Sequence, residues 1–153
     1  MNDPIDIAIL KILQDNGRIS NVEIAQQINL SSPAVHTRIK KMERAGLIKS
    51  YAAILNPEKL LFKLTCFISI GVQLHQADQL TGFRKSIVAM PEVMECYNIT
   101  GEYDYLIKVV VPNRKGLQVL VEELTRITGV SRLYTRIVID ELKSTTALPL
   151  DNI

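Results

Sequence analysis

The chain has 153 residues, of which 47% are hydrophobic and 22% are charged. This composition is typical of a globular protein and argues against a disordered one. No stretch approaches the roughly 18 uncharged apolar residues of a membrane span, and the N-terminus lacks a basic region followed by an apolar run. We therefore expect a cytoplasmic protein. Cys66 and Cys96 lie far apart in apolar stretches, so we expect two buried, reduced thiols and no zinc site.

The net charge of +2 is weak evidence for a nucleic-acid partner, because attraction to phosphate depends on local charge. The distribution of charge is more informative. Between residues 38 and 49 only Glu43 opposes a set of cations, which are Arg38, Lys40, Lys41, Arg44 and Lys49. Positive charge is thus concentrated in one short segment.

Capping residues predict two helices near the N-terminus. Asp3 is suited to cap a helix over residues 4–15, and Gly17 is expected to end it in the left-handed conformation. Ser20 with Glu23 three residues later is a capping box, which predicts that a second helix begins there.

A third helix is predicted from Ser32 as its cap and Pro33 at its first position, and it should end at Gly46. Residues 47–55 then have the pattern of a short strand. We place a domain boundary at about residue 60, which divides the chain into a first domain over 1–60 and a second over 61–153.

The second domain shows alternating and helical apolar patterns in turn. The predicted elements are a strand over 64–74, a helix around 80–87, strands over 93–99 and 105–111, a helix over 117–127 and a strand over 133–142. This order is the ferredoxin-like βαββαβ arrangement, an antiparallel sheet with both helices on one face. The predicted fold class is therefore α+β.

The second and third helices, joined by a turn of about three residues, resemble the unit that places one helix in a DNA major groove. We predict that the face left free by the core residues contacts DNA through Ser31, Ser32, Ala34, His36, Thr37, Lys40, Lys41 and Arg44, with Arg38 at its edge. His36 and Thr37 can reach base edges, whereas the cations suit phosphates. A basic run alone is more often a solvated helix face, but here capping, turn length and charge agree.

Metal and catalytic sites are not indicated. The two histidines, His36 and His75, lack ligand partners at metal-binding spacing, and helix capping explains the hydroxyls of Ser31 and Ser32. We expect no metal, no cofactor and no enzymatic activity.

The Gly101-x-x-Asp104 hairpin is open to two interpretations. Glycine and aspartate are common in plain turns. However, a glycine lets backbone N–H groups approach an anion, and the Asp104 carboxylate can accept an ammonium group. An amino acid carries both charges.

Nearly the whole chain resembles the Lrp/AsnC family, the feast/famine regulators of bacteria and archaea. The resemblance rests on three groups of residues that occur in the family's order and spacing. They are Asp6-x-x-Ile9-Leu10-x-x-Leu13-Gln14 with Arg18-Ile19-Ser20, then Leu30-Ser31-x-Pro33 with Arg38-Ile39 and Met42-Glu43-x-x-Gly46-Leu47-Ile48, and finally the run from Thr100 to Val109.

The resemblance implies a winged helix-turn-helix followed by a sheet domain that dimerises, with dimers commonly closing into octameric rings. It also implies an amino-acid effector held between dimers by the hairpin of one and the last strand of a neighbour. The corresponding positions here are Thr100, Gly101, Asp104, Tyr134, Thr135 and Arg136. The family often has Thr-x-Thr where this chain has Leu133-Tyr134-Thr135, so one polar group is replaced by leucine.

These observations predict a sequence-specific transcription regulator that binds a palindromic operator in double-stranded DNA. An amino acid bound by its oligomeric C-terminal domain would modulate assembly or DNA binding. The alternative is an amino-acid-binding oligomer or assembly scaffold whose basic helix contacts another protein. An enzyme on a ferredoxin-like sheet is a third hypothesis, because that fold alone implies no function.

Overall fold

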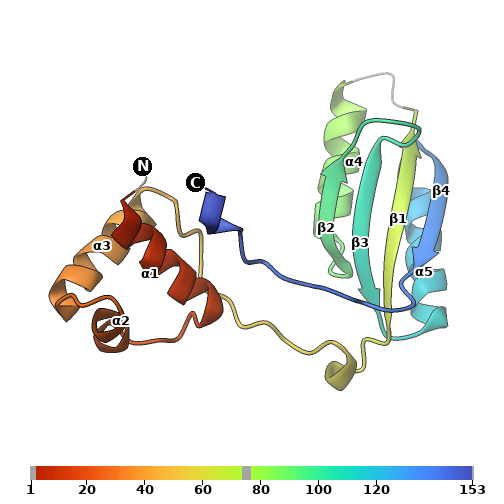
Figure 1. Ribbon diagram of the computed structural model, residues 1–153. Coiled ribbons are helices and arrows are strands. Elements are labelled where there is room, and N and C mark those ends of the chain that lie inside the picture. The colour runs from red at the N-terminus through yellow and green to blue at the C-terminus, as the bar shows by residue number, and fades with distance from the viewer. Residues whose placement is uncertain (1–2, 74–76, 153) are drawn as a thin grey trace. The chain divides into compact units, whose positions relative to one another are not determined.

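The computed structural model describes residues 3–73 and 77–152, which form two compact units (Figure 1). The first unit runs to Ile54 and includes the segment that begins at Lys143, and the second is Leu55–Leu142. The expected second domain extended to residue 153, whereas the C-terminal segment belongs with the first unit. Each unit has its own hydrophobic core. No helix within these residues has the length and apolar character needed to cross a membrane.

The first unit is built from three helices, α1 (Pro4–Asp15), α2 (Asn21–Gln27) and α3 (Ser32–Arg44). The predicted caps of the first two are confirmed. The Asp3 side chain accepts a hydrogen bond from the backbone N–H of Ile5 at 2.9 Å, and Ser20 and Glu23 form the reciprocal capping box. The buried core residues that these helices share are Ile9, Ile24, Ala25, Val35, Ile39 and Met42.

Two helix ends differ from the expectation. Asn16 caps the C-terminus of α1 with an extended backbone. Gly17 does not have a positive φ, so the predicted left-handed conformation of this glycine was wrong. The cap of α3 is Ser31, whose hydroxyl accepts from the N–H of Ala34 at 3.3 Å. Ser32 and Pro33 therefore occupy the first turn, where proline's missing N–H has no helical partner to lose.

The strand predicted over residues 47–55 is wrong for the single chain. Gly46 ends α3 with a φ of 71°, and the segment that follows contains no strand. A strand needs a neighbouring backbone to complete its hydrogen bonds, and no part of the described chain pairs with this segment. The next regular element is the short helix η1 (Glu58–Leu60).

The second unit has the predicted element order and topology. Its strands are β1 (Leu64–Val72), β2 (Val93–Asn98), β3 (Tyr105–Val111) and β4 (Val130–Ile137), and its helices are α4 (Ala77–Ala89) and α5 (Arg114–Arg126). The sheet order is β2-β3-β1-β4 with every pair antiparallel, which confirms the ferredoxin-like fold. The last strand begins and ends earlier than the predicted 133–142, and Leu74 lies outside the described residues.

The two faces of this sheet are different. One face packs against α4 and α5 (Figure 1), and its buried residues include Cys66, Ile68, Ile70, Ile107 and Val109. The other, which we call the open face, is not covered by any helix of the second unit. It carries the alternate residues of each strand, including Thr65, Phe67, Ser69, Gly71, Glu95, Tyr97, Leu106, Lys108, Val110, Arg132, Tyr134 and Arg136.

The prediction for the cysteines is confirmed for one of them. Cys66 is free and buried on the helix side of β1. Cys96 is free but exposed, so its predicted burial was wrong. It lies on β2, which is an edge strand and has a neighbour on one side only.

The C-terminal segment docks on α1. The Gln14 side-chain amide bonds both backbone groups of Leu148, with Nε2 donating to the carbonyl oxygen at 3.2 Å and Oε1 accepting from the N–H at 2.7 Å. Lys11 forms an ion pair with Asp151 in the short helix η2 (Leu150–Asn152). No periodic pattern in the sequence marks these contacts, because they join distant parts of the chain through a backbone segment without regular structure.

Candidate functional site

One side of α3 is free of the core and carries most of the predicted contact residues. Val35, Ile39 and Met42 are buried at helical spacing. The residues exposed on the remaining surface of the helix include His36, Thr37, Lys40, Lys41 and Arg44, so the structure brings these predicted positions together. Ser31 is exposed at the cap, whereas Ser32 and Ala34 are partly buried.

Several of these side chains are oriented by neighbours. The Asn21 amide Nδ2 lies 3.3 Å from His36 Nδ1, which links the start of α2 to α3. The Thr37 hydroxyl donates to the Pro33 carbonyl at 2.9 Å, and Lys40 pairs with Glu43 at 2.7 Å.

Lys41 and Arg44 have no ion-pair partner among residues 3–73 and 77–152. Both are exposed and lie in the last turns of α3. They are therefore the cations of this helix that are free to approach an anionic backbone.

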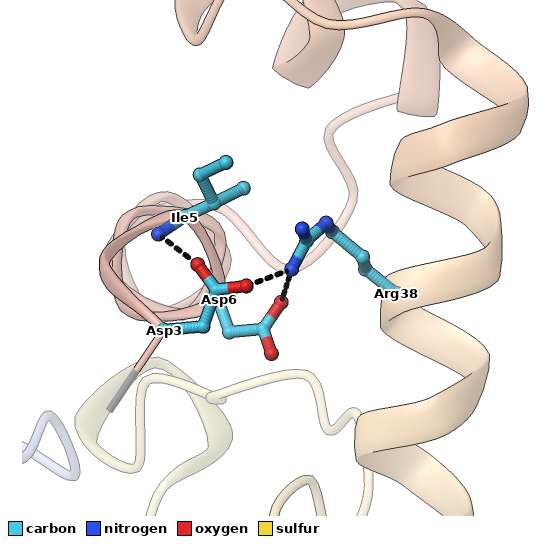
Figure 2. Close-up of polar contacts among 4 residues, drawn as sticks. All are labelled: Asp3, Ile5, Asp6 and Arg38. Carbon is cyan, nitrogen blue, oxygen red and sulfur yellow. Dashed lines mark hydrogen bonds and ion pairs between the residues drawn. The ribbon is translucent and has the colours of Figure 1, made fainter. Parts of the chain in front are cut away.

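Arg38 lies apart from this set. Its Nη1 donates to Asp3 Oδ2 at 2.5 Å and to Asp6 Oδ1 at 2.7 Å, and Asp3 also accepts from the N–H of Ile5 (Figure 2). The guanidinium thus points toward the start of α1. We predicted a phosphate contact for this residue, but in the free chain it holds α3 against α1, and phosphate must compete with two carboxylates.

This ion-pair cluster makes the stability of the first unit depend on pH. The hydrogen bond from Arg38, aided by the N–H of Ile5, holds the pKa of Asp3 below its ordinary value of 3.8. A carboxyl with a depressed pKa stabilises the fold above its ordinary value, and this contribution is lost as pH falls through the folded value. Arg38→Gln should therefore lower the thermal midpoint at pH 7 more than at about pH 3, which lies below the ordinary value of 3.8, so that part of this contribution is already lost.

Thermal unfolding followed by circular dichroism at both pH values measures this difference. Arg18→Gln, which removes an exposed arginine outside the cluster, is the control and should lower the midpoint equally at both values. A deficit for Arg38→Gln of the same size at pH 7 and pH 3 would show that the carboxylates do not engage Arg38 in solution.

The Gly101 hairpin is tied to the end of β1. Gly101 has a positive φ of 115°, as predicted, and no atom lies within 4 Å of the position that a Cβ atom would occupy. The N–H of Asp104 donates to the Ile70 carbonyl at 3.0 Å, and Asp104 Oδ2 accepts from the N–H of Val72 at 2.8 Å. No hydrogen bond to Asp104 Oδ1 occurs within the described part of the chain. The carboxylate is therefore oriented through its Oδ2 atom.

A cavity of about 320 Å³ lies beside this carboxylate. Its lining residues are Gly71, Val72, Gln73, Asp104, Ser131 and Arg132. Of the predicted effector residues only Asp104 lines it. Thr100 and Gly101 shape the hairpin nearby without lining the cavity. Sequence reasoning missed Gly71 and Arg132, although a glycine inside a strand is a recognised signal of close approach by another group.

The predicted residues of the last strand divide between the two faces of the sheet. Tyr134 and Arg136 lie on the open face, where the Arg136 guanidinium stands 5.1 Å from the centre of the Tyr134 ring and donates to the buried Ser69 hydroxyl. Thr135 pairs with Ile68 and lies on the helix side, so the structure does not bring it to Tyr134 and Arg136. The Tyr134 ring stacks on Tyr103 of the hairpin at 6.3 Å.

Both units match known families. Residues 2–49 match the family described as winged helix-turn-helix DNA-binding, and residues 65–148 match the Lrp/AsnC ligand binding domain. The leucine-responsive regulatory protein of Rhizobium meliloti (strain 1021) is 38% identical over 143 residues, or 92% of this chain and 91% of that protein. Its counterpart in Escherichia coli (strain K12) is 36% identical over 147 residues, or 95% and 90% of the two chains.

Solved structures of similar proteins have the same fold. A transcriptional regulator from Neisseria meningitidis, solved as a complex with L-Met, superposes with a TM-score of 0.95 and 36% identity over 99% of this chain and 98% of that one. AsnC of E. coli superposes with a TM-score of 0.87 and 30% identity, over 96% and 98% of the two chains.

Proposed function

Because the chain belongs to the Lrp/AsnC family of transcription regulators, we propose that it binds specific DNA sequences under the control of an amino acid. The chain is a transcription regulator, not an enzyme, with a helix-turn-helix DNA-binding domain and a C-terminal ligand-binding domain. We propose three further properties, which are sequence-specific DNA binding, an amino-acid effector and assembly of several copies. The observation that carries the proposal is that α3 packs into the core of the first unit through one side and exposes polar and basic residues on the other.

The DNA-binding half of the proposal assigns two roles on α3. His36 and Thr37, exposed toward the N-terminal end, contact base edges, where hydrogen bonds carry sequence information. Lys41 and Arg44 contact phosphates, which set affinity and its dependence on salt. A mobility-shift assay separates this function from the scaffold alternative, since a scaffold would not distinguish operator from random DNA.

The effector half of the proposal places an amino acid in the cavity beside Asp104. The support is chemical: the cavity carries a carboxylate for the ammonium group, and its volume of about 320 Å³ suits a small ligand. The Neisseria meningitidis regulator was solved with L-Met, and the relatives from R. meliloti and E. coli are named leucine-responsive. These similarities support an amino acid as the effector of this chain.

Assembly through the open face completes the proposal. One recognition helix covers only a few base pairs, so a palindromic operator requires two copies. Phe67, Leu106 and Val110 give this face an apolar centre, and no helix of the second unit covers it. A second copy of the sheet stacked on this face would bury that surface.

The effector assignment is tested by a thermal-shift screen of the twenty common L-amino acids, followed by calorimetric titration. We expect at least one to stabilise the protein. Asp104→Ala should weaken its binding about tenfold or more, because it removes a charged hydrogen bond of roughly 1.5 to 3 kcal/mol. DNA affinity without the amino acid should stay unchanged.

Asp140→Ala, a carboxylate removed from an exposed loop outside the cavity, is the matched control and should bind like the wild type. Unchanged affinity in Asp104→Ala would return the hairpin to the plain-turn interpretation. Loss of the oligomer with ligand binding intact would make Asp104 an assembly residue.

A further inference from the structure

We propose that Arg132 receives the α-carboxylate of the effector while Asp104 receives its α-ammonium group. This inference rests on the proposed effector function. It adds the residue that selects for a free carboxylate, a role that the hairpin amides near Gly101 were expected to fill. Gly101 does not line the cavity, whereas Arg132 does.

The position of Arg132 depends on Gly71 across the sheet. The two residues pair between β1 and β4, and the arginine stem lies directly over the glycine. A Cβ atom at Gly71 would come within 2.7 Å of Arg132 Cγ and 2.8 Å of its Nε, closer than side chains pack. The Ser131 hydroxyl also donates to the Gly71 carbonyl at 3.0 Å. Glycine thus provides the space that brings the arginine to the cavity wall.

The guanidinium of Arg132 is held on two further sides by the hairpin. It stands 4.6 Å from the centre of the Tyr103 ring, and it donates both to the Glu102 backbone carbonyl and to Glu102 Oε1, the latter at 3.1 Å. The ring and the carbonyl orient the arginine without neutralising it. Among residues 3–73 and 77–152, the carboxylate of Glu102 is the group at this position that a ligand carboxylate can replace.

The exchange of the Glu102 carboxylate for a ligand carboxylate should cost little. The side chains of Arg132 and Glu102 are 51% and 72% exposed, and an exposed ion pair contributes little to stability. A carboxylate presented from the cavity forms the same charge-assisted bonds to the planar guanidinium. Asp104 lines the same cavity, where its Oδ2 accepts from the Val72 N–H, and its Oδ1 has no hydrogen bond among residues 3–73 and 77–152.

The test compares one ligand with and without its carboxylate. The probes are whichever of the twenty L-amino acids binds the wild type most tightly and the α-carboxamide of that amino acid, which keeps the ammonium group. In calorimetric titrations of the full chain, Arg132→Gln should weaken the amino acid about tenfold and leave the carboxamide within about twofold of its wild-type affinity.

Two other variants should respond differently from Arg132→Gln: one should bind the amino acid more tightly, and the other should bind it like the wild type. Glu102→Gln removes the competing carboxylate but keeps the backbone carbonyl, so it should strengthen the amino acid by about two- to fivefold. Arg126→Gln removes an exposed arginine that pairs with Glu122 on α5, away from the cavity, and should change neither affinity. Thermal unfolding of each variant checks that it is folded. Arg132→Ala, which also removes the charge, replaces Arg132→Gln if the glutamine variant does not fold.

The outcomes separate this inference from the effector function. If Arg132→Gln, or Arg132→Ala in its place, leaves the preference for the amino acid over its carboxamide intact while Asp104→Ala weakens both ligands, Arg132 is not the carboxylate receptor but the effector site stands. A loss of affinity in Glu102→Gln would also overturn the exchange. Absence of binding by all twenty amino acids to the wild type would overturn both proposals.

Discussion

Replacing Phe67 by arginine should dissociate the assembled protein and weaken its binding to a two-half-site operator by about 100-fold or more. Phe67 lies on the open face, where its neighbours in register are Lys108 on β3 and Arg136 on β4. The variant therefore puts a third cation between two others at the centre of the proposed interface. Burying an unpaired charge costs several kcal/mol, and about 1.4 kcal/mol corresponds to a tenfold change in affinity.

Sedimentation velocity at micromolar concentration measures the assembly, and a mobility shift measures operator binding. Val88→Arg adds the same charge on α4, where Val88 is 80% exposed outside the open face, and should leave both properties unchanged. A Phe67→Arg protein that sediments like the wild type would show that the subunits associate through a different surface.

On α3, loss of a phosphate contact and loss of a base contact should have different signatures. Arg44→Ala should weaken operator and random DNA to a similar extent and reduce the salt slope by about one. His36→Ala or Thr37→Ala should instead reduce discrimination between operator and random DNA by roughly 1 to 3 kcal/mol, because a base-edge contact is lost.

Fluorescence anisotropy over a range of salt concentrations, with both DNA sequences, distinguishes these signatures. Lys85→Ala, which removes an exposed cation from α4, is the control. Equal losses on both DNA sequences for all three α3 variants would refute the division of roles.

The elements that local chemistry specifies were predictable from the sequence. The caps at Asp3 and Ser20 and the alternation along β1 depend on residues close in the chain, so they could be placed without a structure. The cap of α3 was misplaced by one residue because Ser31 and Ser32 are both good caps and proline fits either of the first two helical positions. The strand over 47–55 failed for a different reason, since pairing depends on a partner that an alternating pattern does not reveal.

The candidate sites were predicted less completely because they depend on tertiary contacts. Arg38 has the helical spacing of a phosphate contact, and only the packing of α1 shows its carboxylate partners. The register of β1 with β4 brings Gly71 to Arg132. A glycine inside a strand signals a close approach, but the sequence does not identify Arg132 as the group that approaches. Thr135 was foreseeable, since alternation along the last strand already places it opposite Tyr134 and Arg136.

The most direct test of a DNA-binding regulator under amino-acid control is one titration, repeated with and without ligand. The protein is titrated by fluorescence anisotropy against DNA from upstream of its own gene and against random DNA, at fixed salt, in the absence and presence of the tightest-binding amino acid. We expect the upstream DNA to bind at least about 1,000-fold more tightly than random DNA. We also expect the amino acid to shift this affinity about fivefold or more. Equal affinity for the two DNA sequences, or an affinity that none of the twenty amino acids changes, would contradict the proposed function.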